Sequence, residues 1–129
     1  HILYHTIETF LPGDQPFIVE SNFRSDFDNN RFTGLQEKYG FTTLQIMCRT
    51  EGAVLFDRFR YRSESGERHP GHMDDQNYGE FKKILLRGSF QPLNLQGQIF
   101  TLDTTDFNLI DYQALFEAIT LACINNVID

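Results

Sequence analysis

Arginine and histidine side chains gather in one short stretch of this chain, residues 58–72. The chain has 129 residues and a formal net charge of −7, yet four of its eight arginines lie in this stretch. A guanidinium group presents a rigid fork of N–H donors that matches phosphate and carboxylate oxygens. The stretch therefore predicts an anion site. The acids Asp57, Glu64 and Glu67 leave a second interpretation open, in which weak ion pairs cover a solvated helix end.

Two arginines of the stretch have the spacing to act as a pair. Arg58 and Arg62 are i,i+4 neighbours and share one face of a predicted helix, while Arg60 lies on another face. Two guanidinium groups on one face suit the oxygens of a phosphate group. An ordinary ion pair of Arg58 with Glu51 or Asp57 is the alternative.

The rest of the stretch is rich in turn residues. Arg68, His69 and His72 lie there and are candidates to recognise a substrate phosphate or carboxylate. The two histidines, with nearby Asp74 and Asp75, have the donor types of a zinc site. Their spacing belongs to a loop and lacks a clear third ligand, so we predict no metal site here.

The composition is that of one folded domain covering residues 1–129. The chain is 40% hydrophobic and has thirteen Phe, which is enough apolar material for a core. Its acidic balance argues against broad binding to nucleic acid or to a membrane surface, because both are negatively charged. No window of about 18 apolar residues and no signal-peptide pattern occur, so we expect a cytoplasmic protein. Cys48 and Cys123 sit in apolar elements and are expected to be reduced and buried.

The elements that must position these residues alternate between strands and helices. Short apolar runs at 16–20, 41–49 and 98–103 predict three strands. Helical periodicity and capping residues predict helices over 3–11, from Asp26 or Asp28 to Gly40, over 51–62, from 81 to Gly88, and over 111–122.

This order implies an α/β fold, a parallel sheet with flanking helices. Ligands bind beyond the carboxyl ends of such strands. That rule places Glu20–Asn22, Arg49–Thr50 and Asp103–Thr105 along one rim.

The pieces and their order resemble the C-terminal two thirds of P-loop kinase-like proteins, the small-molecule kinases of the AAA-related, gluconate-kinase-like type. Residues 17–23 resemble the strand that ends in an acid near the Mg-nucleotide, and residues 44–49 resemble the next core strand. Residues 55–62 are similar to the Arg-x-x-x-Arg helix that opens the lid. Residues 102–105 resemble the last strand, whose following loop often passes near the adenine. The resemblance implies a P-loop NTPase-like fold over almost the whole chain.

The resemblance also implies ATP and Mg as cofactors and gives several residues a role. Arg58 and Arg62 would clamp phosphate oxygens, with Arg60 or Arg68 assisting. Glu20 would orient a Mg-bound water or accept the proton of a substrate hydroxyl. Capping of the following loop is the alternative for Glu20.

Two further groups are implied at the rim. Asn22 and Arg24 would contact the substrate, or else form an ordinary polar turn. Asp103, Thr104 and Thr105 would meet the base or ribose of a nucleotide. A run of this kind more often caps turns and helix starts.

The phosphate cradle of that family, G-x-x-x-x-G-K-[ST], occurs nowhere in these 129 residues. We expect either that an N-terminal part of the protein is absent from this chain or that the protein is a reduced relative, and the opening at His1 favours the first. The missing segment or a partner chain would then complete the sheet.

The expected activity of the intact protein is transfer of phosphate from ATP to the hydroxyl of a small molecule. A non-catalytic module that binds an anion or a partner is the alternative from another class. A processor of single-stranded nucleic-acid ends is a third, which the acidic balance disfavours.

Overall fold

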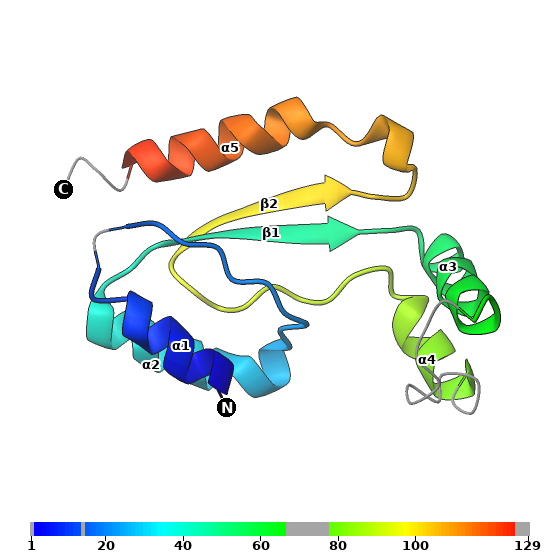
Figure 1. Ribbon diagram of the computed structural model, residues 1–129, viewed down its shortest axis with the longest axis horizontal. Helices are drawn as coiled ribbons and strands as arrows, with labels where there is room; N and C mark the ends of the chain where they lie inside the picture. Colours follow the sequence, from blue (N-terminus) through cyan, green and yellow to red (C-terminus); the bar gives the residue numbers. More distant parts are fainter. Residues whose placement is uncertain (1, 14, 67–77, 126–129) are drawn as a thin grey trace. The chain divides into compact units, whose positions relative to one another are not determined.

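The computed structural model describes residues 2–13, 15–66 and 78–125. Figure 1 shows its elements, which follow in the order α1 (Ile2–Phe10), α2 (Ser25–Tyr39), β1 (Thr43–Arg49), α3 (Gly52–Glu64), α4 (Tyr78–Leu85), β2 (Gly97–Asp103), the 3-10 helix η3 (Phe107–Leu109) and α5 (Tyr112–Asn125). None of the described helices combines the length and the apolar character needed to cross a membrane.

The two strands pair in parallel, and the arrows of β1 and β2 point the same way in Figure 1. The amide of Thr43 donates to the carbonyl of Gln96 at 3.2 Å, and the amide of Thr104 donates to the carbonyl of Arg49 at 2.7 Å. In a parallel ladder, these bonds place Arg49 beside Asp103. The prediction of an α/β fold with a parallel sheet is confirmed, and the two strands end together.

The prediction of a strand over residues 16–20 is wrong. This segment has no strand structure, and the sheet of the described chain has two strands. Ile18 is 89% exposed, whereas Val19 packs against the apolar core of its unit. The apolar run thus supplies a packing residue, but a strand also needs a neighbouring edge that accepts its backbone hydrogen bonds.

Contacts divide the chain into two units, and each unit contains part of each strand. The first unit takes in His1–Ile46, Gln91–Phe100 and Tyr112–Asp129. Its core is formed by four buried side chains, those of Ile7, Phe32, Leu35 and Leu93. The helix predicted to stop at Gly40 is confirmed, because α2 ends at Tyr39 and Gly40 follows with a left-handed φ of 68°.

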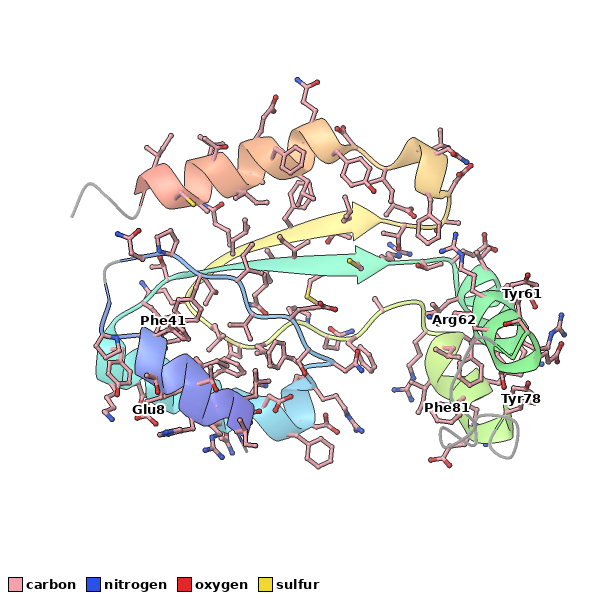
Figure 2. The ribbon with its side chains drawn as sticks, viewed as in Figure 1. Glu8, Phe41, Tyr61, Arg62, Tyr78 and Phe81 are labelled. Atoms are coloured by element: carbon pink, nitrogen blue, oxygen red, sulfur yellow. The ribbon has the colours of Figure 1, made fainter. Side chains whose placement is uncertain are left out.

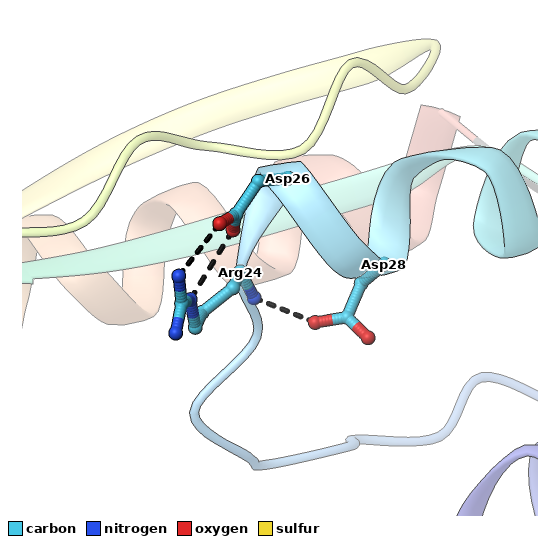
Figure 3. Close-up of polar contacts among 3 residues, drawn as sticks. All are labelled: Arg24, Asp26 and Asp28. Carbon is cyan, nitrogen blue, oxygen red and sulfur yellow. Dashed lines mark hydrogen bonds and ion pairs between the residues drawn. The ribbon is translucent and has the colours of Figure 1, made fainter.

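The start of α2 carries a small polar network, drawn in Figure 3. The guanidinium of Arg24 pairs with the Asp26 carboxylate at 2.6 Å, and the Arg24 amide donates to Asp28 at 2.6 Å. Carboxylates suit this position because the first turn of a helix has free amides. The hydrogen bond from Arg24 holds the pKa of Asp26 below its usual range. Tyr4 also donates to Asp28, and burial followed by that bond raises the pKa of Tyr4 to about 12.

The second unit takes in Met47–Phe90 and Thr101–Asp111. Phe59 of α3 is 7% exposed, and its ring lies 5.9 Å from that of Tyr78 and 5.1 Å from that of Phe81, both on α4. The start of α3 approaches the backbone that follows α4, since a Cβ on Gly52 would lie 2.2 Å from the Leu86 carbonyl oxygen. Aromatic packing and close backbone contact therefore hold α3 and α4 together.

The expectation of buried cysteines is wrong. Cys48 and Cys123 are free thiols, and both are exposed. Apolar neighbours in the sequence do not bury a side chain unless another element covers its face, and a two-stranded sheet leaves much of its surface open.

Glycine at position 97 is required by the sheet, and we predict that Gly97→Ala destabilises the protein. Its φ is 144°, and an added Cβ would lie 2.1 Å from the Thr43 carbonyl oxygen. The strain should lower the free energy of unfolding by about 1–3 kcal/mol in urea denaturation. Gly34→Ala is the matched control, because Gly34 lies within α2 with nothing within 4 Å of its Cβ position. That change should stabilise by about 0.5–1 kcal/mol. Equal effects at both positions would contradict this register.

Candidate functional site

The predicted site residues divide between the two units. Glu20, Asn22 and Arg24 belong to the first unit, whereas the arginines of α3 and the segment Asp103–Thr105 belong to the second. Predictions for Arg68, His69 and His72, and the zinc alternative with Asp74 and Asp75, lie outside the described residues.

The second unit brings several predicted residues together where β1 and β2 end. We call the side chains of Thr50, Arg58, Thr104, Thr105 and Phe107 the strand-end cluster. They come from the β1–α3 junction, from α3, and from the segment between β2 and η3. Residues about fifty positions apart in the sequence meet here because the two strands are paired.

Threonine hydroxyls form the inner part of the cluster. Thr50 is 6% exposed, and its hydroxyl lies 2.8 Å from that of Thr104. The Thr104 hydroxyl donates to the Arg49 carbonyl at 3.1 Å, so its single proton is used and Thr50 must donate to Thr104. The Thr105 hydroxyl accepts from the Glu51 amide at 2.9 Å, immediately before α3 begins. Thr105 thus satisfies a backbone donor near the helix start.

Arg58 forms the outer part of the cluster. Its two terminal nitrogens donate to the carbonyls of Thr104, at 2.8 Å, and Thr105, at 2.7 Å. The guanidinium carbon lies 4.0 Å from the centre of the Phe107 ring. Arg58 does not form the alternative ion pair with Glu51 or Asp57 in the described chain. Its hydrogen bonds go to backbone carbonyls instead.

The other two arginines of α3 have different surroundings. Arg60 pairs with Asp57 at 3.5 Å, and both side chains are more than half exposed, so this pair contributes little to stability. Arg62 is exposed, and its side chain has no hydrogen bond or ion pair with any residue the structure describes. Figure 2 labels Arg62 and its neighbour Tyr61, which is 67% exposed, on α3. The two arginines predicted as a pair therefore differ in their contacts with the described residues: Arg58 bonds two carbonyls, and the Arg62 side chain bonds none of these residues.

Asp103 closes the turn that leaves β2. Its carboxylate accepts from the Thr105 amide at 2.8 Å. Hydrogen bonding from the Thr105 side chain and backbone, followed by the charge of Arg49, holds the pKa of Asp103 below its ordinary value. This is the turn-capping geometry that the sequence leaves open as an alternative for residues 103–105.

The predicted site residues of the first unit do not form a cluster of this kind. Glu20 and Asn22 are exposed. Arg24 is exposed as well, pairs with Asp26, and lies over the ring of Phe27 at 4.5 Å. Arg24 therefore has the ordinary polar contacts of a helix start.

The donor set of the described residues does not make a complete site for Mg and ATP phosphates. No group of three His, Cys, Asp or Glu side chains able to hold a metal ion occurs among them. Mg²⁺ is usually bound through one or two carboxylates together with substrate phosphates, and the sequence has no glycine-rich cradle for those phosphates.

Sequence reasoning missed one member of the strand-end cluster, Phe107, and the side-chain partner of another, Thr50. Phe107 carries no motif, although an aromatic residue shortly after a strand end is a weak signal for stacking on a cation. Thr50 was expected at the rim, but its contact was not: the Thr50 hydroxyl meets that of Thr104. That contact depends on strand pairing and has no local signal.

Comparisons with known proteins find a likeness in structure. No protein-family model matches the chain, and a search of curated proteins finds no significant match. The crystal structure of a putative kinase from Chloroflexus aurantiacus J-10-fl is similar to this chain, with a TM-score of 0.81 and 40% sequence identity. The alignment covers 94% of this chain and 65% of that protein. The chain therefore has a kinase-like α/β fold and spans less than two thirds of the length of that relative.

We predict that replacing Thr50 weakens the cluster. Thr50→Val keeps the shape but leaves the Thr104 oxygen without its donor, which should cost about 1 kcal/mol of unfolding free energy in urea. The control is Thr6→Val, because the Thr6 hydroxyl makes an exposed bond to the Ile2 carbonyl within α1. That change should stay within about 0.5 kcal/mol. A Thr50→Val protein as stable as the control would contradict the hydroxyl arrangement.

A second prediction follows from the lowered pKa of Asp103. A carboxyl with a lowered pKa in the folded state stabilises the fold above its unfolded pKa, here about 3.8, and loses that contribution as pH falls through the folded pKa. Urea midpoints of the wild type and Asp103→Ala should therefore differ at pH 7 and converge below pH 3.8. A difference that persists unchanged into acid would show that the charged carboxylate is not responsible.

Proposed function

We propose that the intact protein transfers the terminal phosphoryl group of ATP to the hydroxyl of a small molecule. The observation that carries the proposal is the likeness to a putative kinase at 40% identity over 94% of this chain. The arrangement at the strand ends supports it, because ligands of parallel α/β sheets bind beyond the carboxyl ends of the strands. The strand-end cluster and the arginines of α3 lie in the unit that contains this end of the sheet.

Phosphoryl transfer depends mainly on positioning and on neutralising charge. We assign Arg62 to the transferred phosphoryl group, assisted by Arg60 and by Arg68. Arg58 would join them only by giving up the carbonyls of the segment after β2. That segment, residues 103–105, is assigned to the base or ribose of the nucleotide.

Acceptor chemistry is assigned to the segment before α2. In the proposed step, the acceptor oxygen bonds to the γ-phosphorus, the bond from that phosphorus to the bridging oxygen breaks, and ADP leaves. In the role that the sequence resemblance implies, the hydroxyl proton would pass to the carboxylate of Glu20, which is exposed. Asn22 and Arg24 would orient the acceptor, and His69 and His72 would recognise an anionic group on it. Mg is the expected cofactor, held chiefly by groups outside the described residues.

The proposal also requires further strands beside the two-stranded sheet. Ile46 on β1 is 39% exposed and Ile99 on β2 is 55% exposed, and in the observed register they lie on opposite faces of the sheet. Parallel sheets are normally covered on both faces and extended beyond two strands. We propose that strands from a segment outside this chain, or from a partner chain, complete the sheet. We place the protein in the cytoplasm, where ATP is available and the two free thiols stay reduced.

A non-catalytic anion-binding module is the second candidate. The absence of a G-x-x-x-x-G-K-[ST] run from these 129 residues favours it, because phosphoryl transfer in the resembling family needs that cradle. Its arginines would hold an anionic ligand or an acidic segment without any chemical step.

We predict that the longest natural form of the protein turns over ATP in the presence of Mg²⁺ and that Arg62→Gln and Glu20→Gln each lower kcat by about 100-fold. The matched control is Arg87→Gln, because Arg87 is exposed and follows α4 outside the proposed site. ADP release is measured with coupled enzymes. Turnover that is unchanged in both site variants would refute the residue assignment. ATP binding without turnover, measured by calorimetry, would favour the binding module.

A further inference from the structure

One guanidinium group, that of Arg58, bonds two consecutive main-chain carbonyls. The two acceptors are the carbonyl oxygens of Thr104 and Thr105, at 2.8 and 2.7 Å. Both bonds are charge-assisted, and such bonds are about twice as strong as those between neutral groups. The acceptors belong to the backbone, so the contact fixes the path of the chain rather than one side chain.

The same segment closes around the guanidinium from a second side. Phe107 lies two residues beyond Thr105, and its ring centre is 4.0 Å from the guanidinium carbon of Arg58. The intervening Asp106 accepts from the Asn108 amide at 2.9 Å, which starts η3 and sets the direction of the chain at Phe107. Residues 104–107 therefore turn around the end of the Arg58 side chain.

The start of α3 provides a separate attachment for this segment. The Glu51 amide donates to the Thr105 hydroxyl, and the Thr50 hydroxyl meets that of Thr104. Residues 104 and 105 are thus held both at the first residue before α3 and at Arg58, in the second turn of the helix. Loss of Arg58 would remove one attachment and leave the other.

We infer that Arg58 is a positioning residue that fixes residues 104–107 against α3, and that it couples any movement of α3 to this segment. No acidic side chain among the described residues pairs with Arg58, so its guanidinium bonds the two carbonyls without competition from a described carboxylate. Arg62, one turn later, has neither kind of contact within the described chain, so the coupling belongs to Arg58 and not to the arginine pair. The inference does not depend on phosphoryl transfer.

The test is amide hydrogen exchange of the full chain, with Arg58→Gln compared with its matched control, Arg62→Gln. In Arg58→Gln the amides of residues 104–108 should exchange about tenfold faster or more, because the segment can then open without breaking the charge-assisted bonds. In Arg62→Gln the same amides should keep their wild-type rates. The core amides of α2 should be unaffected in both.

Arg58→Lys separates positioning from general stability. The ammonium keeps the charge and can meet one carbonyl, but it cannot bridge two while it stacks on Phe107. Protection of residues 104–108 should therefore be partly restored relative to Arg58→Gln, while the amides of α2 keep the same rates in both variants. If Arg58→Gln does not fold, Arg58→Lys is compared directly with the wild type, and faster exchange confined to residues 104–108 is then expected.

Two results would overturn the inference. One is unchanged exchange at residues 104–108 when Arg58 is replaced. The other is a uniform rise in exchange across the second unit, which would mean that Arg58 only stabilises the fold. A protein that fails to turn over ATP but shows the local rise would lose its proposed function and keep this inference.

Discussion

The parallel pairing of β1 with β2 is the interaction on which the rest of the structure depends. It joins segments more than fifty residues apart in the sequence and places Arg49 beside Asp103. Each unit contains part of both strands, and the contacts of Arg58 with residues 104 and 105 lie where the strands end. Gly97 shows how strict the register is, since only glycine allows the backbone of β2 to lie so close to Thr43.

The strand-end cluster illustrates how a charge can be used without an opposite charge beside it. Arg58 bonds two carbonyls and stacks on Phe107, so its desolvation is offset by hydrogen bonds and by the ring. Arg60, by contrast, forms an exposed ion pair, and Arg62 has no partner in the described part of the chain. Three arginines within five residues of one helix thus have three different environments.

Several features were predictable because they are local. The end of α2 follows from its periodicity and Gly40, and the turn at Asp103 follows from a short side chain beside backbone amides. The start of α2 was expected at Asp26 or Asp28, but the helix begins at Ser25. The strand predicted at 16–20 shows the limit, because an apolar run cannot reveal whether a neighbouring edge exists to receive its hydrogen bonds. The exposure of Cys48 has the same cause, since the residues next to Cys48 in the sequence do not indicate whether another element covers that face of the strand.

The sequence by itself determined the α/β class, the strands at β1 and β2, and the concentration of arginine on α3. These depend on the alternation of short apolar runs with helical periods, which acts over one element at a time. Only the tertiary structure decided which arginine is engaged. Arg58 and Arg62 have the same side chain and share a helix face, and they differ because β2 ends beside β1 and delivers two carbonyls and an aromatic ring to Arg58 alone. A contact of that kind is set by the register of a distant strand, which no local pattern encodes.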